Sequence, residues 1–429
     1  MYNSQQFEIK LRHIFLFLMV YFTTIFFTGC NSSESPTQNS AGPSIVIGTV
    51  FESPLEFDAG ENPIGITFAD FNDDNKTDYI VASSRKQNGI STTLDGTLTL
   101  FKKNSSSSSQ FPFISSTITP ITAEWRQDVI SADFTGDNKT DLVVTQTGQE
   151  KIKLLRNDGS ANFTDNGSTI VGEIPIKLIY GDWNSDNQTD LAVVNRDNNS
   201  VSVLQNSSSV FLVTQTLSLS ASPIQIAGED WNSDNATDLA VLVRDNNLVQ
   251  IWLNDGTGNF IKQTNSYTVG GLPIGMISGD WNCDGKKDLA VSNSGDNTLS
   301  LIYGKGNGDF DTPVTISSGR GPGALAAADF DNDSKMDFVV GHHFLVSTTG
   351  VSHLTGDFSL TLSDTSSSTG YGSPTSLAVT TVKDGSFPAE IVISDVNDDT
   401  KLDILITLPV SKKLSVLSGK LYYGNLSCP

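Results

Sequence analysis

Short apolar runs separated by turns rich in Gly, Asn and Asp recur through most of the chain. In one stretch, strand-like composition is found at residues 273–279, 289–292, 298–303 and 310–317, with turn residues between them. The first of these runs contains small residues, which suit a strand crowded near an axis. None of these units follows the 3.6-residue period of an amphipathic helix. The pattern predicts four strands in each unit.

An acidic nine-residue segment follows the first strand of every unit. In the third copy it reads Asp182-Trp-Asn-Ser-Asp-Asn-Gln-Thr-Asp190, directly before Leu-Ala-Val-Val. Self-similarity at this period indicates a repeat architecture, and four strands per period are typical of a propeller blade. We predict an all-β, seven-bladed β-propeller over residues 46–429. The seven copies, at steps of 63, 49, 48, 50, 49 and 66 residues, begin at Asp70, Asp133, Asp182, Asp230, Asp280, Asp329 and Asp395.

The two ends of the repeat region complement each other. Residues 51–57 match the fourth-strand segment that begins at Phe310, whereas the last copy is one strand short. We expect residues 46–58 to supply the outer strand of the last blade. Such a strand would close the ring and leave fewer open sheet edges.

Each nine-residue segment has the side-chain chemistry of a cation-binding loop. Side-chain oxygens recur at positions one, three, five and nine, and position seven can offer its backbone carbonyl, an arrangement that suits Ca²⁺. Position twelve is an apolar strand residue such as Val193, which excludes an EF-hand. We predict up to seven Ca²⁺ ions between the first and second strands of the blades. The predicted ligands are Asp70, Asn72, Asp74, Lys76 and Asp78; Asp133, Thr135, Asp137, Lys139 and Asp141; Asp182, Asn184, Asp186, Gln188 and Asp190; Asp230, Asn232, Asp234, Ala236 and Asp238; Asp280, Asn282, Asp284, Lys286 and Asp288; Asp329, Asp331, Asp333, Lys335 and Asp337; and Asp395, Asn397, Asp399, Lys401 and Asp403.

Two of these loops are expected to bind weakly or to stay vacant. Thr135 replaces Asn or Asp at position three of the second copy. Thr400 is β-branched at position six, where a tight turn favours Asn or Gly.

Composition limits the partners. The chain of 429 residues is 37% hydrophobic and has a formal net charge of −22, which argues against binding nucleic-acid backbones or anionic membranes by charge. Many carboxylates are gathered in the loops, so that without metal they should repel one another and loosen the fold. The three cysteines, Cys30, Cys283 and Cys428, give no disulfide framework.

The first 29 residues have the features of an export signal. Lys10 and Arg12 precede an apolar run at residues 14–27, too short to span a bilayer but suited to a signal-peptide core. The run ends in Phe27-Thr-Gly-Cys30, which resembles the lipobox of bacterial lipoproteins and implies lipidation of Cys30. Residues 30–45 have the composition of a flexible tether. We expect an exported protein, lipid-anchored in the outer membrane or at the cell surface; a plain signal peptide is the alternative.

The run Gly-Asp-Trp-Asn-x-Asp-x-x-x-Asp-Leu-Ala-Val resembles the FG-GAP/VCBS repeats of integrin-α-type β-propellers. The resemblance covers about residues 46–425 and implies the propeller fold. The Phe-Gly and Gly-Ala-Pro elements of the integrin motif are mostly missing. Integrin ligand specificity is therefore not implied.

Function is expected on the face opposite the acidic loops. Two insertions, residues 85–96 and about 344–356, fall between second and third strands and so point to that face, as do Trp125, Arg126 and Arg320. Tolerated insertions of no function are the plainer interpretation. We favour a monomeric, non-catalytic protein that binds an extracellular protein or glycan and no nucleic acid, with the lipid as its only membrane contact.

Two other functions remain open. An exported, glycan-degrading enzyme would need one irregular cluster of convergent polar groups, and a lectin would need a repeated aromatic residue or Arg outside the loops. No catalytic residue is predicted, because the paired carboxylates are assigned to cations. The tryptophans at position two, Trp183, Trp231 and Trp281, are expected to pack between blades. His342, His343 and His353 are expected to be solvated loop residues.

Overall fold

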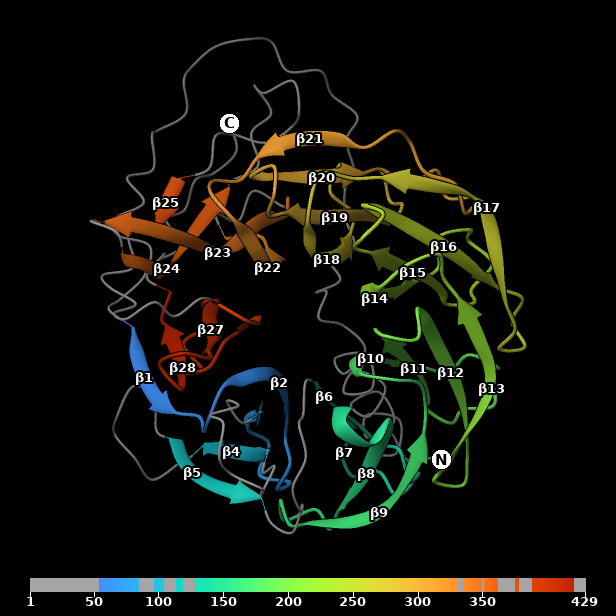
Figure 1. Cartoon of the computed structure of the whole chain (residues 1–429). Helices are drawn as coiled ribbons and strands as arrows, with labels where there is room; N and C mark the ends of the chain where they lie inside the picture. Colours follow the sequence, from blue (N-terminus) through green and yellow to red (C-terminus); the bar gives the residue numbers. More distant parts are fainter. Residues whose placement is uncertain are drawn as a thin grey trace, which may run out of the picture.

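The computed structural model describes residues 54–84, 96–103, 113–118, 128–330, 335–348, 351–361, 375–377 and 388–419. These residues form β-strands arranged as antiparallel sheets around a central axis (Figure 1), with a 3₁₀ turn, η2, at Thr147–Gln149. Within the described residues, no helix is long and apolar enough to cross a membrane. The expected signal segment and the tether lie outside the described residues.

Six sheets are complete blades of four consecutive strands, counted here from the N-terminal end. Blades one to three are β2 (Pro63–Ala69), β3 (Asp78–Ser83), β4 (Thr97–Lys103) and β5 (Phe113–Ile118); β6 (Val129–Ala132), β7 (Asp141–Gln146), β8 (Lys151–Asn157) and β9 (Phe163–Ile170); and β10 (Pro175–Gly181), β11 (Asp190–Asn195), β12 (Ser200–Ser207) and β13 (Val210–Ser218). Blades four to six are β14 (Pro223–Glu229), β15 (Asp238–Val243), β16 (Leu248–Asn254) and β17 (Phe260–Thr268); β18 (Pro273–Gly279), β19 (Asp288–Asn293), β20 (Thr298–Ile302) and β21 (Val314–Ser317); and β22 (Pro322–Ala328), β23 (Asp337–Thr348), β24 (Val351–Thr361) and β25 (Thr375–Leu377).

The predicted count of seven blades is corrected to six continuous blades and one composite sheet. In the composite, called the closing sheet, β26 (Ile391–Ser394), β27 (Asp403–Leu408) and β28 (Lys413–Leu417) are joined by β1 (Leu55–Asp58). The last sequence copy supplies only three described strands, so the other end of the chain completes its sheet. The expected contribution of an N-terminal strand is confirmed, although the described strand is shorter than residues 46–58.

The core lies between neighbouring sheets, where aromatic residues at loop position two are buried. Trp183 and Trp231 are at most 2% exposed, and Trp281 is 4% exposed. Each of them packs against the next blade: Trp183 lies edge-on to Phe260 and Trp281 lies against Phe338. The predicted blade-to-blade packing of these tryptophans is confirmed.

A cluster of one buried and two partly exposed charged residues joins the first strands of several sheets, at the ends of these strands away from the acidic loops. The Lys177 Nζ on β10 lies 3.2 Å from Asp128 Oδ1 and 2.7 Å from Glu390 Oε1. Glu390 also accepts the backbone N–H of Ile66 on β2 at 3.0 Å. Burial raises the pKa of Asp128 to about 6, against the opposing effect of Lys177. The network links blades one, two and three to the closing sheet.

The second insertion is not a loop. Residues 344–356 belong largely to β23 and β24, which pair continuously from Phe338 with Thr361 to Thr348 with Val351. Its β-branched and aromatic residues simply continue the two strands. The first insertion, at residues 85–95, and Trp125 and Arg126 lie outside the described residues.

His342, His343 and His353 were expected in loops, but the structure places all three in β-strands. His342 and His343 are in β23 and His353 is in β24. His342 is 4% exposed, and its Nδ1 lies 3.0 Å from the backbone carbonyl oxygen of Arg320. The ring fills the space beside Gly319, where a Cβ would meet it at 3.1 Å.

Candidate metal centre

The acidic segments connect the first and second strands of the sheets, as the sequence predicts. Their ninth residue, an Asp, is the first residue of the second strand in every sheet. Because the sheets share one orientation around the axis, all seven segments lie at the same face, called here the loop face (Figure 1). Residues 331–334 of the sixth segment, with Asp331 and Asp333, are outside the described residues.

The Asp at position one accepts backbone N–H groups of its own loop in the six loops that the structure describes in full. In the third loop, Asp182 Oδ1 accepts the N–H of Asp186 at 3.0 Å and Oδ2 accepts the N–H of Asn187 at 2.8 Å. Asn187, at position six, has a φ of +65°. Asn and Gly tolerate this left-handed conformation, whereas a β-branched residue is strained in it. Thr400 adopts it too, with a φ of +69°, which agrees with its identification as the poorest fit.

Positions three and five are also tied together. Asn184 Oδ1 accepts the N–H of Asp186 at 3.1 Å, and its Nδ2 donates to Asp186 Oδ2 at 3.1 Å. Asp186 Oδ1 accepts the N–H of Gln188 at 2.8 Å. The side-chain oxygens at positions one, three and five are therefore gathered over one short turn.

The Asp at position nine is buried beneath this turn. Asp190 is 0% exposed, and its Oδ2 accepts the N–H of Trp183 at 3.0 Å while Oδ1 accepts the N–H of Asn206 at 2.7 Å. Burial is the largest influence on these carboxyls, and it outweighs the two N–H donors. It raises the pKa to about 6 for Asp78, Asp190 and Asp403, and to about 7 for Asp238 and Asp288.

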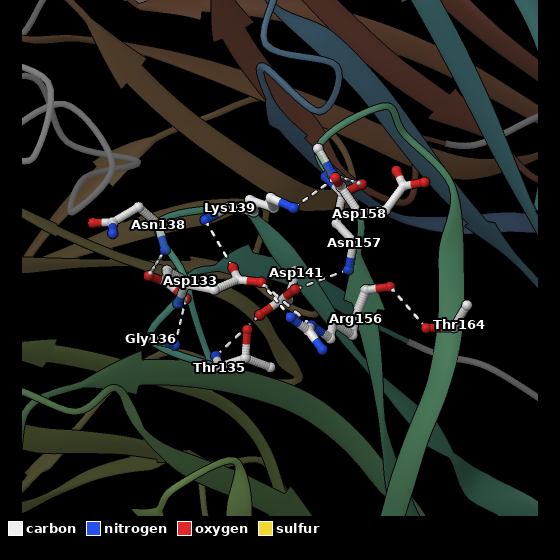
Figure 2. A network of polar contacts seen from close by, with 12 residues as sticks. Asp133, Thr135, Gly136, Asn138, Lys139, Asp141, Arg156, Asn157, Asp158 and Thr164 are labelled. Carbon is white, nitrogen blue, oxygen red and sulfur yellow. Dashed lines mark hydrogen bonds and ion pairs between the residues drawn. The ribbon is translucent and has the colours of Figure 1, made fainter.

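The second loop meets a distance criterion for a cation. Asp133, Asp137 and Asp141 each offer an oxygen atom within 4.8 Å of the others. Two oxygens bound to one Ca²⁺ at about 2.4 Å lie at most ~4.8 Å apart, so these residues fit the ion. Figure 2 shows this loop, which Arg156 and Asn157 approach from β8. The carboxylates therefore converge in a loop that was expected to be weak because of Thr135.

Cationic side chains at the loops were missed by sequence reasoning, which assigned only a backbone carbonyl to position seven. The Nζ of Lys286 lies 3.3 Å from Asp284 Oδ2, and that of Lys401 lies 3.5 Å from Asp399 Oδ2. Arg156 pairs with Asp137 at 2.9 Å. The Arg and Lys side chains thus contact the same position-five carboxylate that a bound cation would contact. The alternation of Lys and Asp in the loop sequence was a signal that could have found the two lysines.

Comparison with known protein families agrees with this geometry. Residues 230–291 and 280–340 match the FG-GAP-like repeat, and they contain the loops that begin at Asp230, Asp280 and Asp329. The chain is an FG-GAP-repeat β-propeller. No curated protein matches the chain.

Solved structures similar to this FG-GAP-repeat propeller share its fold at low sequence identity. BBS1N, in a complex with ARL6DN, is 10% identical with a TM-score of 0.59, and the match covers 88% of this chain and 99% of that chain. A putative 6-phosphogluconolactonase from Bacteroides fragilis is 10% identical with a TM-score of 0.54, covering 79% and 92%. A Lactobacillus plantarum protein is 15% identical with a TM-score of 0.50, covering 75% and 85%. These likenesses show the fold alone.

The raised pKa values predict a pH dependence for the metal-free FG-GAP-repeat propeller. An Asp whose pKa is higher in the folded state than its unfolded value of about 3.9 binds more protons when folded, so stability falls as pH rises from about 4 to about 7. After chelation, the melting temperature should be higher at pH 5 than at pH 7.5. Excess Ca²⁺ should raise it mainly at pH 7.5. A chelated protein that melts at a higher temperature at pH 7.5 would contradict the assignment of these buried carboxyls.

Proposed function

We propose that this FG-GAP-repeat propeller is a non-catalytic, calcium-stabilised binding protein, held in the bacterial cell envelope by a lipid on Cys30, that binds an extracellular protein or glycan. One observation carries the non-catalytic assignment. The loop carboxylates accept backbone N–H groups at almost every oxygen, as Asp182 and Asp190 do in the third loop. Groups held in this way serve a scaffold better than proton transfer.

The seven acidic loops are proposed as the calcium sites. In the second loop Asp133, Asp137 and Asp141 would hold the ion, which would supply positive charge between carboxylates that otherwise repel. The residues of this chain set the coordination by closing the turn and by burying Asp141. In this proposal the loop face is the rigid side of the scaffold.

The face opposite the loops is proposed as the recognition surface. There the β23–β24 hairpin of blade six has strands of 12 and 11 residues, whereas the second strands of the other sheets have 6. Because Asp337 at the start of β23 lies at the loop face, the paired ends of the two strands, Thr348 and Val351, lie beyond the opposite face. Extra length on a rigid scaffold is a common place for binding sites.

Shortening this hairpin tests the recognition surface. Phe344 pairs with Thr355, so residues 345–354 can be replaced by Asn-Gly, which forms a tight hairpin turn. We expect an unchanged melting temperature and the loss of binding on glycan and extracellular-protein arrays. The control carries the same Asn-Gly at Ser208 and Ser209, a two-residue turn at the loop face with φ values of +54° and +71°. Equal array binding by the shortened protein and the control would refute the proposed surface.

The lipid anchor has a separate test. Cys30→Ser should move the protein from the membrane pellet to the soluble fraction of the cell envelope, because the thioether-linked lipid on this residue is its proposed attachment. Retention of Cys30→Ser in the pellet would contradict attachment through this residue.

A further inference from the structure

Three blades place an asparagine where the third strand reaches the loop face. These residues, Asn157, Asn206 and Asn254, are at most 4% exposed. Their backbone N–H groups donate to Oδ1 of the position-nine Asp in the same blade, at 2.9, 2.7 and 2.8 Å respectively. Each asparagine therefore fixes the buried carboxylate of its own loop.

The side chain of each asparagine reaches the loop of the preceding blade. The Nδ2 of Asn157 donates to the backbone carbonyl of Phe71, that of Asn206 to Phe134, and that of Asn254 to Trp183, each at 2.9 Å. The acceptors are all at loop position two. The Oδ1 atoms accept N–H groups from the turn that follows in their own blade, as Gly159 donates to Asn157 at 3.1 Å. The asparagine side chains are therefore fully used in joining two loops.

The residue at position two is also hydrogen-bonded to the position-nine Asp of its own loop. Its N–H donates to Oδ2 of the position-nine Asp in its own loop, at 3.1 Å for Phe134 and 3.0 Å for Trp183. A continuous series of hydrogen bonds thus links loops four to one. In order, it runs through Asp238, Asn254, Trp183, Asp190, Asn206, Phe134, Asp141, Asn157, Phe71 and Asp78.

Glycine occupies the equivalent position in blade five and in the closing sheet. Gly304 and Gly419 keep the N–H bond to Asp288 and Asp403, at 2.7 and 2.9 Å, but have no side chain to extend it. A Cβ on Gly304 would lie 2.0 Å from the carbonyl oxygen of Lys287, so no side chain fits there. Within the described part of the chain, the asparagine connection is therefore confined to loops one to four.

We propose that loops one to four bind their cations cooperatively through Asn157, Asn206 and Asn254. The proposal rests on the proposed calcium binding and concerns how the sites communicate. A cation that fixes the position-nine carboxylate of one loop orders the asparagine bonded to it. That asparagine in turn orders position two of the preceding loop. The first cation bears most of the conformational entropy cost of ordering these loops. Each later cation meets a loop that is already partly ordered and therefore binds more tightly than the first.

Native mass spectrometry of the chelated protein during a Ca²⁺ titration tests this coupling. The titration is made in a background in which Asp280→Ala, Asp329→Ala and Asp395→Ala disable loops five to seven, and this background stands for the natural protein in the comparisons that follow. The expected distribution then has few species with one to three ions, because coupling raises successive affinities by about 5- to 150-fold. Asn206→Ala separates loops three and four from loops one and two and should populate species with two ions. The control, Asn162→Ala, removes an exposed asparagine at the same face whose Nδ2 bonds only Asp158 at 2.8 Å. It should titrate as the natural protein does.

The outcomes separate the two proposals. If no Ca²⁺ binds, the calcium function itself is refuted. If Ca²⁺ binds with the distribution of independent sites, or if Asn206→Ala titrates as the natural protein does, the coupling is refuted and the calcium function stands. If Asn206→Ala does not fold, Asn206→Gly reproduces the residue of blade five, and the natural protein's own distribution still decides between coupled and independent sites.

Discussion

Removal of β1 is expected to lower the free energy of unfolding by about 5 kcal/mol or more, because the strand completes the closing sheet. Phe57 on β1 packs edge-on to Phe113 at 5.5 Å and to Phe101 at 6.2 Å, both in blade one. Full burial of a Phe side chain contributes about 1.5–3 kcal/mol, and Phe57 is half-buried. The lost pairing with β28 adds to this contribution. The measurement compares the melting temperatures of two deletion variants, one lacking residues 1–58 and the other lacking residues 1–53.

The shorter deletion is the matched control, since it keeps β1 intact. A drop on the order of 5 °C or more is expected only for the longer deletion, given an unfolding entropy of about 2.1 cal/mol/K per residue. Phe57→Ala should reproduce part of the drop. Equal melting temperatures for the two deletions would show that β1 does not close the ring.

Trp183→Ala is expected to cost about 3–5 kcal/mol, because it empties a fully buried site between blades three and four. Gly181 lies against the Trp183 ring and allows a second test of the same packing. A Cβ on Gly181 would lie 2.3 Å from Cζ3 of Trp183, so the indole occupies the space that alanine would need. Gly279 stands in the same relation to Trp281, at 2.4 Å from Cη2.

A double substitution tests this packing. Copies with Phe at position two have Ala two residues earlier, as in the Ala69 and Phe71 pair. Gly181→Ala alone should cost about 1–3 kcal/mol by overpacking, and Trp183→Phe alone should leave a cavity. Together they should cost at least ~1 kcal/mol less than the two single costs combined. If chemical denaturation shows that the cost of the double substitution equals the sum of the two single costs, the proposal that the Trp183 ring occupies the space of an alanine Cβ at position 181 is contradicted.

The loops and their order could be predicted from the sequence because their signal is local. Asp182 to Asp190 contains all the residues that close one turn, and seven copies fix the period of the sheets. The closing strand was predictable for the same reason, since residues 51–57 resemble another copy. Local resemblance is enough where each repeat folds on itself.

Features that depend on contacts between blades could not be predicted. Asn206 reaches Phe134 across 72 positions, and Lys177 reaches Glu390 across 213. No periodicity within one copy identifies such partners. The β23–β24 hairpin was misassigned for a different reason, because length added to both strands in register resembles an inserted loop in the sequence.

Isothermal titration calorimetry of the chelated protein with Ca²⁺ tests the central claim most directly, because it counts the ions that the loops hold. The account predicts a stoichiometry of six or seven, because the carboxylates of the second loop converge despite Thr135, with the lower value if the loop of Thr400 stays vacant. Asp238→Asn should reduce the count by at least one, since it removes a buried ligand charge. A titration with no heat of binding, or with a stoichiometry unaffected by Asp238→Asn, would contradict the assignment of these loops as calcium sites.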